Sequence, residues 1–229
     1  MPTVALPDVT LHYTEVGDPT APPVVLLHGT PANSTRWTDI AAALADGYRV
    51  IAVDQRGHGR SGHTPTYSFE SYRRDVLDFA DALGLDRFAL VGHSMGGTVA
   101  CLFAEHHSDR LTALVLVDSP PPREPGDWDP GPRPTGDLDY DWNVLPAIFA
   151  QLNKPDPAWW AELPRIAVPT LLVSGGSTSP VPPEWNVDLV SLVPGARLVT
   201  IEGAGHQVHT NRPTEFLAAV RPFLDSTAR

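Results

Sequence analysis

The sequence predicts an α/β protein built on a doubly wound, mostly parallel sheet. Short apolar runs recur along the chain, and stretches with helical spacing of apolar residues separate them. The runs are rich in Val, Leu and Ile and show no polar alternation, which is typical of strands buried on both faces of a parallel sheet. The length of 229 residues fits one domain.

The elements follow in a regular order along the chain. Two N-terminal strands, near 3–6 and 10–16, are expected to add an antiparallel edge. The buried strands are expected at 24–29, 49–54, 88–93, 114–118, 170–175 and 197–203. Helices are expected near 37–45, 68–83, 95–107, 183–192 and 213–225. Gly84 supplies a stop for the second helix and Pro213 a start for the last one.

Residues 119–169 interrupt this order. They contain 12 prolines, and each proline removes a backbone donor and fixes its φ. Only 143–153 and 158–163 have a helical pattern there. A disordered linker is one interpretation, but the segment holds several tryptophans, and disordered segments are poor in aromatic residues. We therefore predict a single domain over 1–229, with 119–169 as a short lid over the strand ends.

Composition limits the classes of function. The net charge of −11 argues against binding to a nucleic-acid backbone, which needs clustered Lys and Arg. No apolar run has the length of a membrane span, and the first residues lack the pattern of a signal peptide. The single cysteine, Cys101, cannot form an internal disulfide. A cytoplasmic location is expected, and the arginine-rich, lysine-poor composition is typical of a GC-rich bacterial genome.

The stretch "VGHSMGG" (91–97) predicts a serine nucleophile at Ser94. It follows a buried strand and opens a helix, and Gly92 and Gly96 leave room for a sharp turn that exposes the hydroxyl. The amide of Met95 starts the helix and points the same way, which suits an oxyanion. A Gly-x-Ser-x-Gly pattern also arises by chance, but the strand before it and the helix after it favour the functional interpretation.

His206 is the expected base. It follows a strand and two glycines in "EGAGHQVH" (202–209), close to the last helix. Its task is to take the proton of Ser94 Oγ and pass it to the leaving group. His209 forms a His-x-x-His pair with it, which could suggest a metal site. No further set of ligands stands nearby, so neither a metal nor another cofactor is expected.

The motifs "LLHGTP", "DQRGHGRSG", "VGHSMGG" and "GAGHQVHTNRPTEF" occur in this order, and together they resemble the α/β-hydrolase family. The resemblance covers roughly 24–118 and 165–225 and implies a sheet of the α/β-hydrolase type. It also implies oxyanion donors at the amides of Thr30 and Met95. His28 is expected to orient the oxyanion loop. Trp37 matches an aromatic residue that follows this loop and is expected either to floor the pocket or to fill the core.

The acid of a catalytic triad is missing from its commonest position. In the family that position follows the strand at 170–174, and here it is occupied by Ser179. Asp118 closes the strand after Ser94 and its helix, at the same end of the sheet, and some branches of the family place their acid there. We predict Asp118 as the acid. A turn-capping role for Asp118, a serine–histidine pair without an acid, and other carboxylates remain open: Glu202, Asp127, Asp129, Asp137, Asp139 and Asp141.

These residues predict a serine hydrolase that cleaves an ester, thioester or lactone through an acyl-enzyme. Trp37 and the lid residues Trp142 and Trp159 are expected to contact a small-molecule substrate with an acyl or aromatic group. Two alternatives stay open. One is a lyase or cyclase that uses the histidine as base. The other is a ligand-binding module with a vestigial triad, which the serine at 179 favours. Binding to nucleic acid or membrane is not expected, and the oligomeric state is unassigned.

Overall fold

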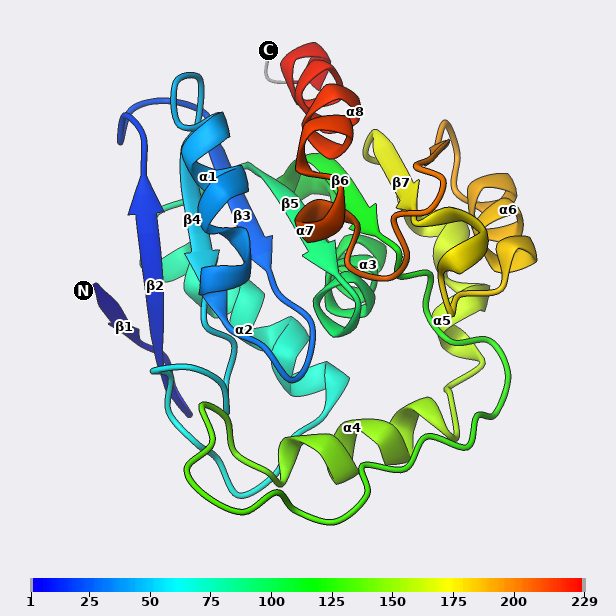
Figure 1. The fold of residues 1–229 in the computed structure, drawn as a ribbon. Helices are drawn as coiled ribbons and strands as arrows, with labels where there is room; N and C mark the ends of the chain where they lie inside the picture. Colours follow the sequence, from blue (N-terminus) through cyan, green and yellow to red (C-terminus); the bar gives the residue numbers. More distant parts are fainter. Residues whose placement is uncertain (1, 228–229) are drawn as a thin grey trace.

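The computed structural model describes residues 2–227 and centres on an eight-stranded sheet (Figure 1). The strands lie in the order β1-β2-β4-β3-β5-β6-β7-β8. Their bounds are Thr3–Ala5 (β1), Thr10–Val16 (β2), Pro23–Leu27 (β3), Arg49–Val53 (β4), Phe88–His93 (β5), Leu111–Val117 (β6), Thr170–Ser174 (β7) and Arg197–Thr200 (β8). The strands β3 to β8 are parallel, and β1 and β2 form an antiparallel edge. The predicted fold class is confirmed.

Helices cover both faces of this sheet (Figure 1). Successive strand residues point to opposite faces, so Val24 and Leu26 pack in one core with α1 and α8, whereas Val25 and Leu27 pack in the other with α2, α3 and α6. This burial on two faces explains why the strands carry no polar alternation. The helix bounds are Thr38–Leu44 (α1), Phe69–Ala82 (α2), Met95–His107 (α3), Pro183–Leu192 (α6) and Pro213–Thr227 (α8).

The helix ends follow from local chemistry. Ser68 caps α2 because its hydroxyl accepts a hydrogen bond from the Ser71 amide, and the Ser71 hydroxyl accepts one from the Ser68 amide. Gly84 ends the same helix because it adopts a φ of 65°, which favours glycine. Four short segments form 3-10 helices: Ser34–Trp37 (η1), Ser108–Arg110 (η2), Leu163–Arg165 (η3) and Gly176–Thr178 (η4). A short α-helix lies at Val208–Asn211 (α7).

Between β6 and β7 the chain leaves the sheet through residues 119–169, which we call the insertion. Its proline-rich first half has no helix, and the helices α4 (Val144–Leu152) and α5 (Ala158–Ala161) follow where helical spacing predicted them. The insertion curves past the carboxyl ends of the strands (Figure 1). No helix within residues 2–227 combines the length and the apolar character needed to cross a membrane.

Hydrogen bonds hold the insertion in place. Backbone hydrogen bonds join Asp141 N to Gly57 O and Gly59 N to Asp139 O, both at 2.7 Å. Within the insertion itself, Trp160 Nε1 donates to Pro121 O at 3.0 Å. These bonds satisfy backbone groups of a segment whose prolines prevent regular pairing. The insertion is therefore hydrogen-bonded to the loop after β4.

Candidate active site

Ser94 lies on the single-residue turn between β5 and α3. Its φ of 53° and ψ of −122° fall in a region that L-residues rarely adopt. Neighbouring glycines make the turn possible. A Cβ on Gly92 would collide with the Gly96 carbonyl, and one on Gly96 would lie 2.6 Å from the Leu27 carbonyl oxygen. The chain thus reverses sharply and presents the Ser94 hydroxyl at the carboxyl end of the sheet.

A chain of hydrogen bonds joins Ser94, His206 and Asp118. His206 Nδ1 lies 2.8 Å from Asp118 Oδ2, and His206 Nε2 lies 2.9 Å from Ser94 Oγ. A carboxylate only accepts, so Nδ1 carries the ring proton and donates to Asp118. Nε2 then accepts from the Ser94 hydroxyl. The structure brings together the three side chains that the sequence singled out.

Asp118 follows directly after β6 and is fully buried. Its φ is 50°, and within residues 2–227 only Ser94 and Asp118 combine a positive φ with a side chain other than that of glycine. Its amide donates to Val173 O at 2.8 Å, which closes the turn. The Gly175 amide donates to Asp118 Oδ1 at 2.9 Å. The backbone around Asp118 is therefore arranged to hold the carboxylate against His206.

Ser179 stands beside this carboxylate. Its hydroxyl donates to Asp118 Oδ2 at 2.6 Å, so the serine at the commonest acid position of the family contacts the carboxylate that follows the neighbouring strand. The other carboxylates have different partners. Glu202 accepts from the Ser177 amide at 3.2 Å, and Asp141 accepts from the Tyr67 hydroxyl at 2.7 Å.

The loop after β3 packs directly on the Ser94 turn. A Cβ on Gly29 would lie 2.8 Å from Ser94 Cβ, and Thr30 lines the same cavity as Ser94 and Met95. Met95 is the first residue of α3, so its amide has no acceptor within the helix. This places the two residues expected to supply oxyanion donors around one space.

His28 holds this loop by hydrogen bonds to backbone. Its Nδ1 donates to Gly29 O at 2.7 Å, and its Nε2 accepts from the Gln55 amide at 3.0 Å. Burial lowers the pKa of His28 to about 4, so the ring is neutral at pH 7. Both ring nitrogens are occupied, which fits the loop-orienting role expected for this residue.

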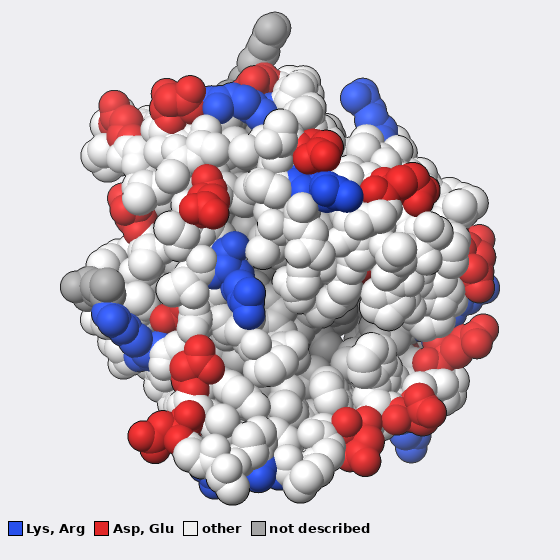
Figure 2. Space-filling view, in the orientation of Figure 1, with Lys and Arg blue, Asp and Glu red and all other residues white. Residues whose placement is uncertain are grey.

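A cavity of about 620 Å³ opens beside Ser94 and His206. Apolar side chains form much of its wall, among them Trp128 and Phe149 of the insertion and Trp185 of α6. Glu124 and Asp127 also line it, and the described residues around it include no Lys or Arg. In Figure 2 a hollow lies near the middle of the molecule, and acidic side chains gather below and to the right of it.

The three tryptophans expected to bind substrate do not line this cavity. Trp37 is fully buried, and its ring stacks on that of His209 with 4.0 Å between centroids. It fills the core beneath α1 and α8, which is the second of the two roles considered for it. Trp159 packs edge-on against Phe69 at 5.1 Å, and Trp142 is half-buried just before α4.

The placement of these tryptophans at the pocket is therefore corrected: Trp128 and Trp185 occupy the wall instead. In the sequence, Trp128 stands in the proline-rich coil and Trp185 follows the "SPVPP" stretch (179–183). A coil without periodicity gives no indication of which side chain points inward. The three-dimensional path of the chain determines which tryptophans line the cavity.

Two further histidines surround the site and were not predicted to contribute. His93 precedes Ser94, and its Nε2 donates to the His206 carbonyl at 2.8 Å, which connects the loop that carries His206 to β5. His209 is buried against Trp37, and burial lowers the pKa of His209 to about 3. In the part of the chain that the structure describes, no three His, Cys, Asp or Glu side chains form a possible metal site.

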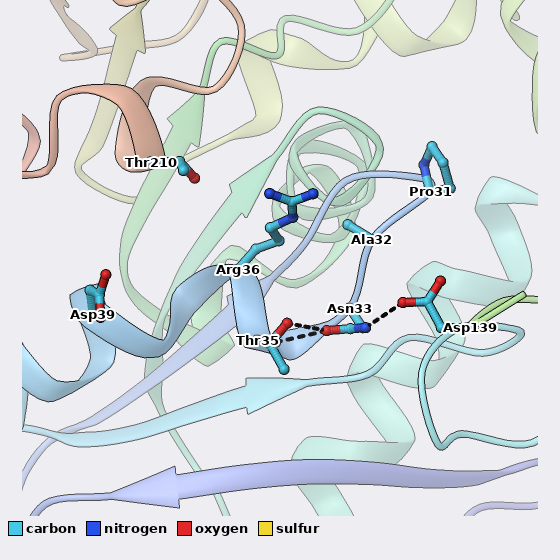
Figure 3. A pocket seen from close by; sticks show the side chains of 8 residues that line it. All are labelled: Pro31, Ala32, Asn33, Thr35, Arg36, Asp39, Asp139 and Thr210. Carbon is cyan, nitrogen blue, oxygen red and sulfur yellow. Dashed lines mark hydrogen bonds between the residues drawn. The ribbon is translucent and has the colours of Figure 1, made fainter.

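A second, polar hollow of about 410 Å³ is lined in part by Pro31 and Asn33 of the loop after β3 (Figure 3). Asn33 lines it and donates from Nδ2 to Asp139 Oδ2 of the insertion at 2.8 Å. Its Oδ1 accepts from the Thr35 amide at 3.0 Å. Asn33 thus connects the insertion to the loop that carries Thr30, and Arg36 extends beside it (Figure 3).

The chain belongs to the α/β-hydrolase family, because the family model described as alpha/beta hydrolase fold matches residues 22–142. It is 31% identical over 253 residues to the mouse (Mus musculus) sn-1-specific diacylglycerol lipase ABHD11. The alignment covers 91% of this chain and 82% of that relative. It is 27% identical over 238 residues to the esterase YbfF of Escherichia coli K12. This alignment covers 89% of this chain and 93% of the esterase.

Solved structures agree with this assignment. A thermophilic esterase from Thermogutta terrifontis superposes with a TM-score of 0.86 at 25% identity, over 100% of both chains. Epoxide hydrolases and an enol-lactonase are also similar to this chain. These relatives are hydrolases of several kinds, and they support hydrolysis as the general class of activity.

Proposed function

We propose that the protein is a serine hydrolase that cleaves a carboxylic ester, thioester or lactone through an acyl-enzyme. The observation that carries this proposal is the continuous hydrogen-bonded chain from Ser94 Oγ through His206 to Asp118 Oδ2, at the edge of a cavity. Hydrolases and esterases among the relatives support the same class.

In the proposed reaction, Ser94 Oγ attacks the carbonyl carbon of the substrate while its proton passes to His206 Nε2. The amides of Thr30 and Met95 donate to the negatively charged oxygen that develops. His206 then gives the proton to the leaving oxygen or sulfur, and the acyl group stays on Ser94. A water molecule, deprotonated by His206, attacks this acyl-enzyme and releases the acid.

Asp118 is proposed as the acid of the triad. Its carboxylate keeps the proton of His206 on Nδ1 and stabilises the imidazolium that forms during proton transfer. The hydrogen bond between Asp118 and His206 supports a complete triad over a ligand-binding module with a vestigial triad. A base-only lyase or cyclase remains an alternative outcome of the experiment below.

The insertion is proposed as a lid over a substrate of small to medium size. Residues 119–169 supply much of the cavity wall, and a volume of about 620 Å³ suits a single acyl or aromatic ligand. The arrangement of one domain with a reduced lid, predicted from the sequence, is retained as part of this proposal.

The test is a panel of p-nitrophenyl esters and lactones, run on wild type, Ser94→Ala and Asp118→Asn. Ser94→Ala is expected to abolish turnover, and Asp118→Asn to lower kcat by about 10⁴ because the ring loses the acceptor that orients it. A capping aspartate would instead cost about 1 kcal/mol of stability and leave catalysis nearly intact. Turnover that persists in Ser94→Ala would contradict the acyl-enzyme and favour the lyase alternative.

A further inference from the structure

Ser179 makes a contact that the triad itself does not require. It lies just after η4, and its Oγ donates to Asp118 Oδ2 at 2.6 Å while accepting from the Val181 amide at 3.0 Å. The Val181 amide occupies a lone pair of the hydroxyl, and an ionised carboxylate has no proton to give. The hydroxyl proton of Ser179 must therefore point at Asp118.

The same oxygen also accepts a hydrogen bond from His206 Nδ1. Asp118 Oδ2 accepts from His206 Nδ1 at 2.8 Å and from Ser179, while Oδ1 accepts from the Gly175 amide. Asp118 is fully buried, and a buried charge is costly unless donors surround it. With one donor on Oδ1 and two on Oδ2, rotation of the carboxylate would break hydrogen bonds on both oxygens.

We infer that Ser179 is a positioning residue that holds Asp118 in the orientation His206 needs. This inference rests on the proposed function, because it assigns Ser179 a role through the proposed acid. Ser179 touches neither Ser94 nor the reacting atoms. Its contribution should appear when the imidazolium forms, which is in the transition state and not in substrate binding.

A purely structural role is the competing explanation. The Val181 contact shapes the loop before α6, and loss of that turn could lower activity without any effect through Asp118. The two roles differ in how they combine with a change at Asp118. A residue that acts through Asp118 loses its influence once the carboxylate is gone, whereas a structural residue keeps it.

The experiment is a double-mutant cycle of Ser179→Ala and Asp118→Asn with a p-nitrophenyl ester. Ser179→Ala alone is expected to lower kcat about tenfold with KM nearly unchanged, as for loss of a hydrogen bond to a charged group. In the Asp118→Asn background, Ser179→Ala should cause no further loss. Ser179→Thr keeps the hydroxyl and should retain most of the activity.

Ser177→Ala is the matched control. Ser177 lies in the same loop, but its hydroxyl donates to Glu202 Oε2 at 3.3 Å and not to Asp118. It should leave kcat unchanged. An equal loss from Ser179→Ala in both backgrounds, or no loss at all in the wild-type background, would overturn the positioning role.

A spectroscopic readout separates this inference from the proposed function. The proton on His206 Nδ1, which is hydrogen-bonded to Asp118, can be followed by nitrogen-edited NMR in the absence of any substrate. Ser179→Ala should shift or broaden this resonance, and Ser177→Ala should not. An unchanged resonance in Ser179→Ala overturns the inference even if esters are hydrolysed. A changed resonance supports it even if no tested ester is turned over.

Discussion

Ser94 and Asp118 both hold a backbone conformation that side chains other than glycine rarely adopt. Such a conformation costs about 1–3 kcal/mol and persists only where the surrounding structure fixes it. Each residue stands at the end of a central strand, and the two strands are neighbours in the sheet. The strain therefore aims the hydroxyl and the carboxylate at opposite nitrogens of one imidazole.

Glu105 on α3 gives a residue-level prediction about stability. It is 4% exposed, the Cys101 thiol donates to its Oε1 at 3.9 Å, and burial raises the pKa of Glu105 to about 8. The folded protein keeps this proton up to about pH 8, whereas the unfolded chain releases it near 4.5. Between these values the folded state binds more protons, so the free energy of unfolding falls as the pH rises.

Glu105→Gln should remove this dependence. From pH 6 to pH 8, wild type is expected to lose about 2 kcal/mol more unfolding free energy than the variant. Denaturant unfolding at the two pH values measures the difference. Parallel losses in the two proteins would show that Glu105 does not carry the effect.

At this scale the sequence predicted some site residues and missed others, for physical reasons. Ser94 and His206 stand in motifs with a demanding local geometry, so their type and spacing were informative. Asp118 could be inferred because parallel strands end at one edge of the sheet. Ser179 as a donor to Asp118, and His93 as a donor to the His206 loop, depend on contacts between distant segments that no local pattern records.

Among the elements, the insertion is the one whose structure the sequence predicted least. Strands and helices of the sheet layers were predictable because burial on two faces and 3.6-residue spacing leave strong patterns. The proline-rich coil has no such period, so its path and the place of Trp128 at the cavity wall are known only from the structure. The ring of Trp128 lies 5.8 Å from that of Phe149, and its backbone is held by Asn153.

Trp128 gives a prediction for the cavity wall. Trp128→Ala removes apolar surface that a longer acyl chain would cover, so KM for p-nitrophenyl octanoate should rise about tenfold with little change in kcat. The acetate ester, too short to reach the wall, should be unaffected. Trp142→Ala is the matched control, since Trp142 lies outside the cavity. Equal effects of both substitutions on both esters would refute a specific role for Trp128.

For the whole molecule, charge is the property that bears on substrate choice. The net charge is −11, and the segment 124–141 contains six carboxylates but only one arginine. Glu124 and Asp127 line the cavity itself, and Figure 2 shows acidic side chains below and to the right of the hollow near the middle of this face. A negative field of this kind lowers the local concentration of anions.

The protein should therefore discriminate against anionic esters. At low salt, kcat/KM for the p-nitrophenyl monoester of succinate is expected to be about tenfold below that for the uncharged pentanoate. Added salt should narrow the gap by screening, and so should the double variant Glu124→Gln, Asp127→Asn. Faster hydrolysis of the anionic ester would contradict this account of the cavity.

The central claim is that the Ser94 hydroxyl, activated by His206, becomes covalently acylated. Treatment with a fluorophosphonate followed by peptide mass spectrometry tests it most directly. We predict a single stoichiometric adduct on the peptide that contains Ser94, and strongly slowed labelling in His206→Ala. An unmodified Ser94, or an adduct on another residue with Ser94 free, would contradict the account.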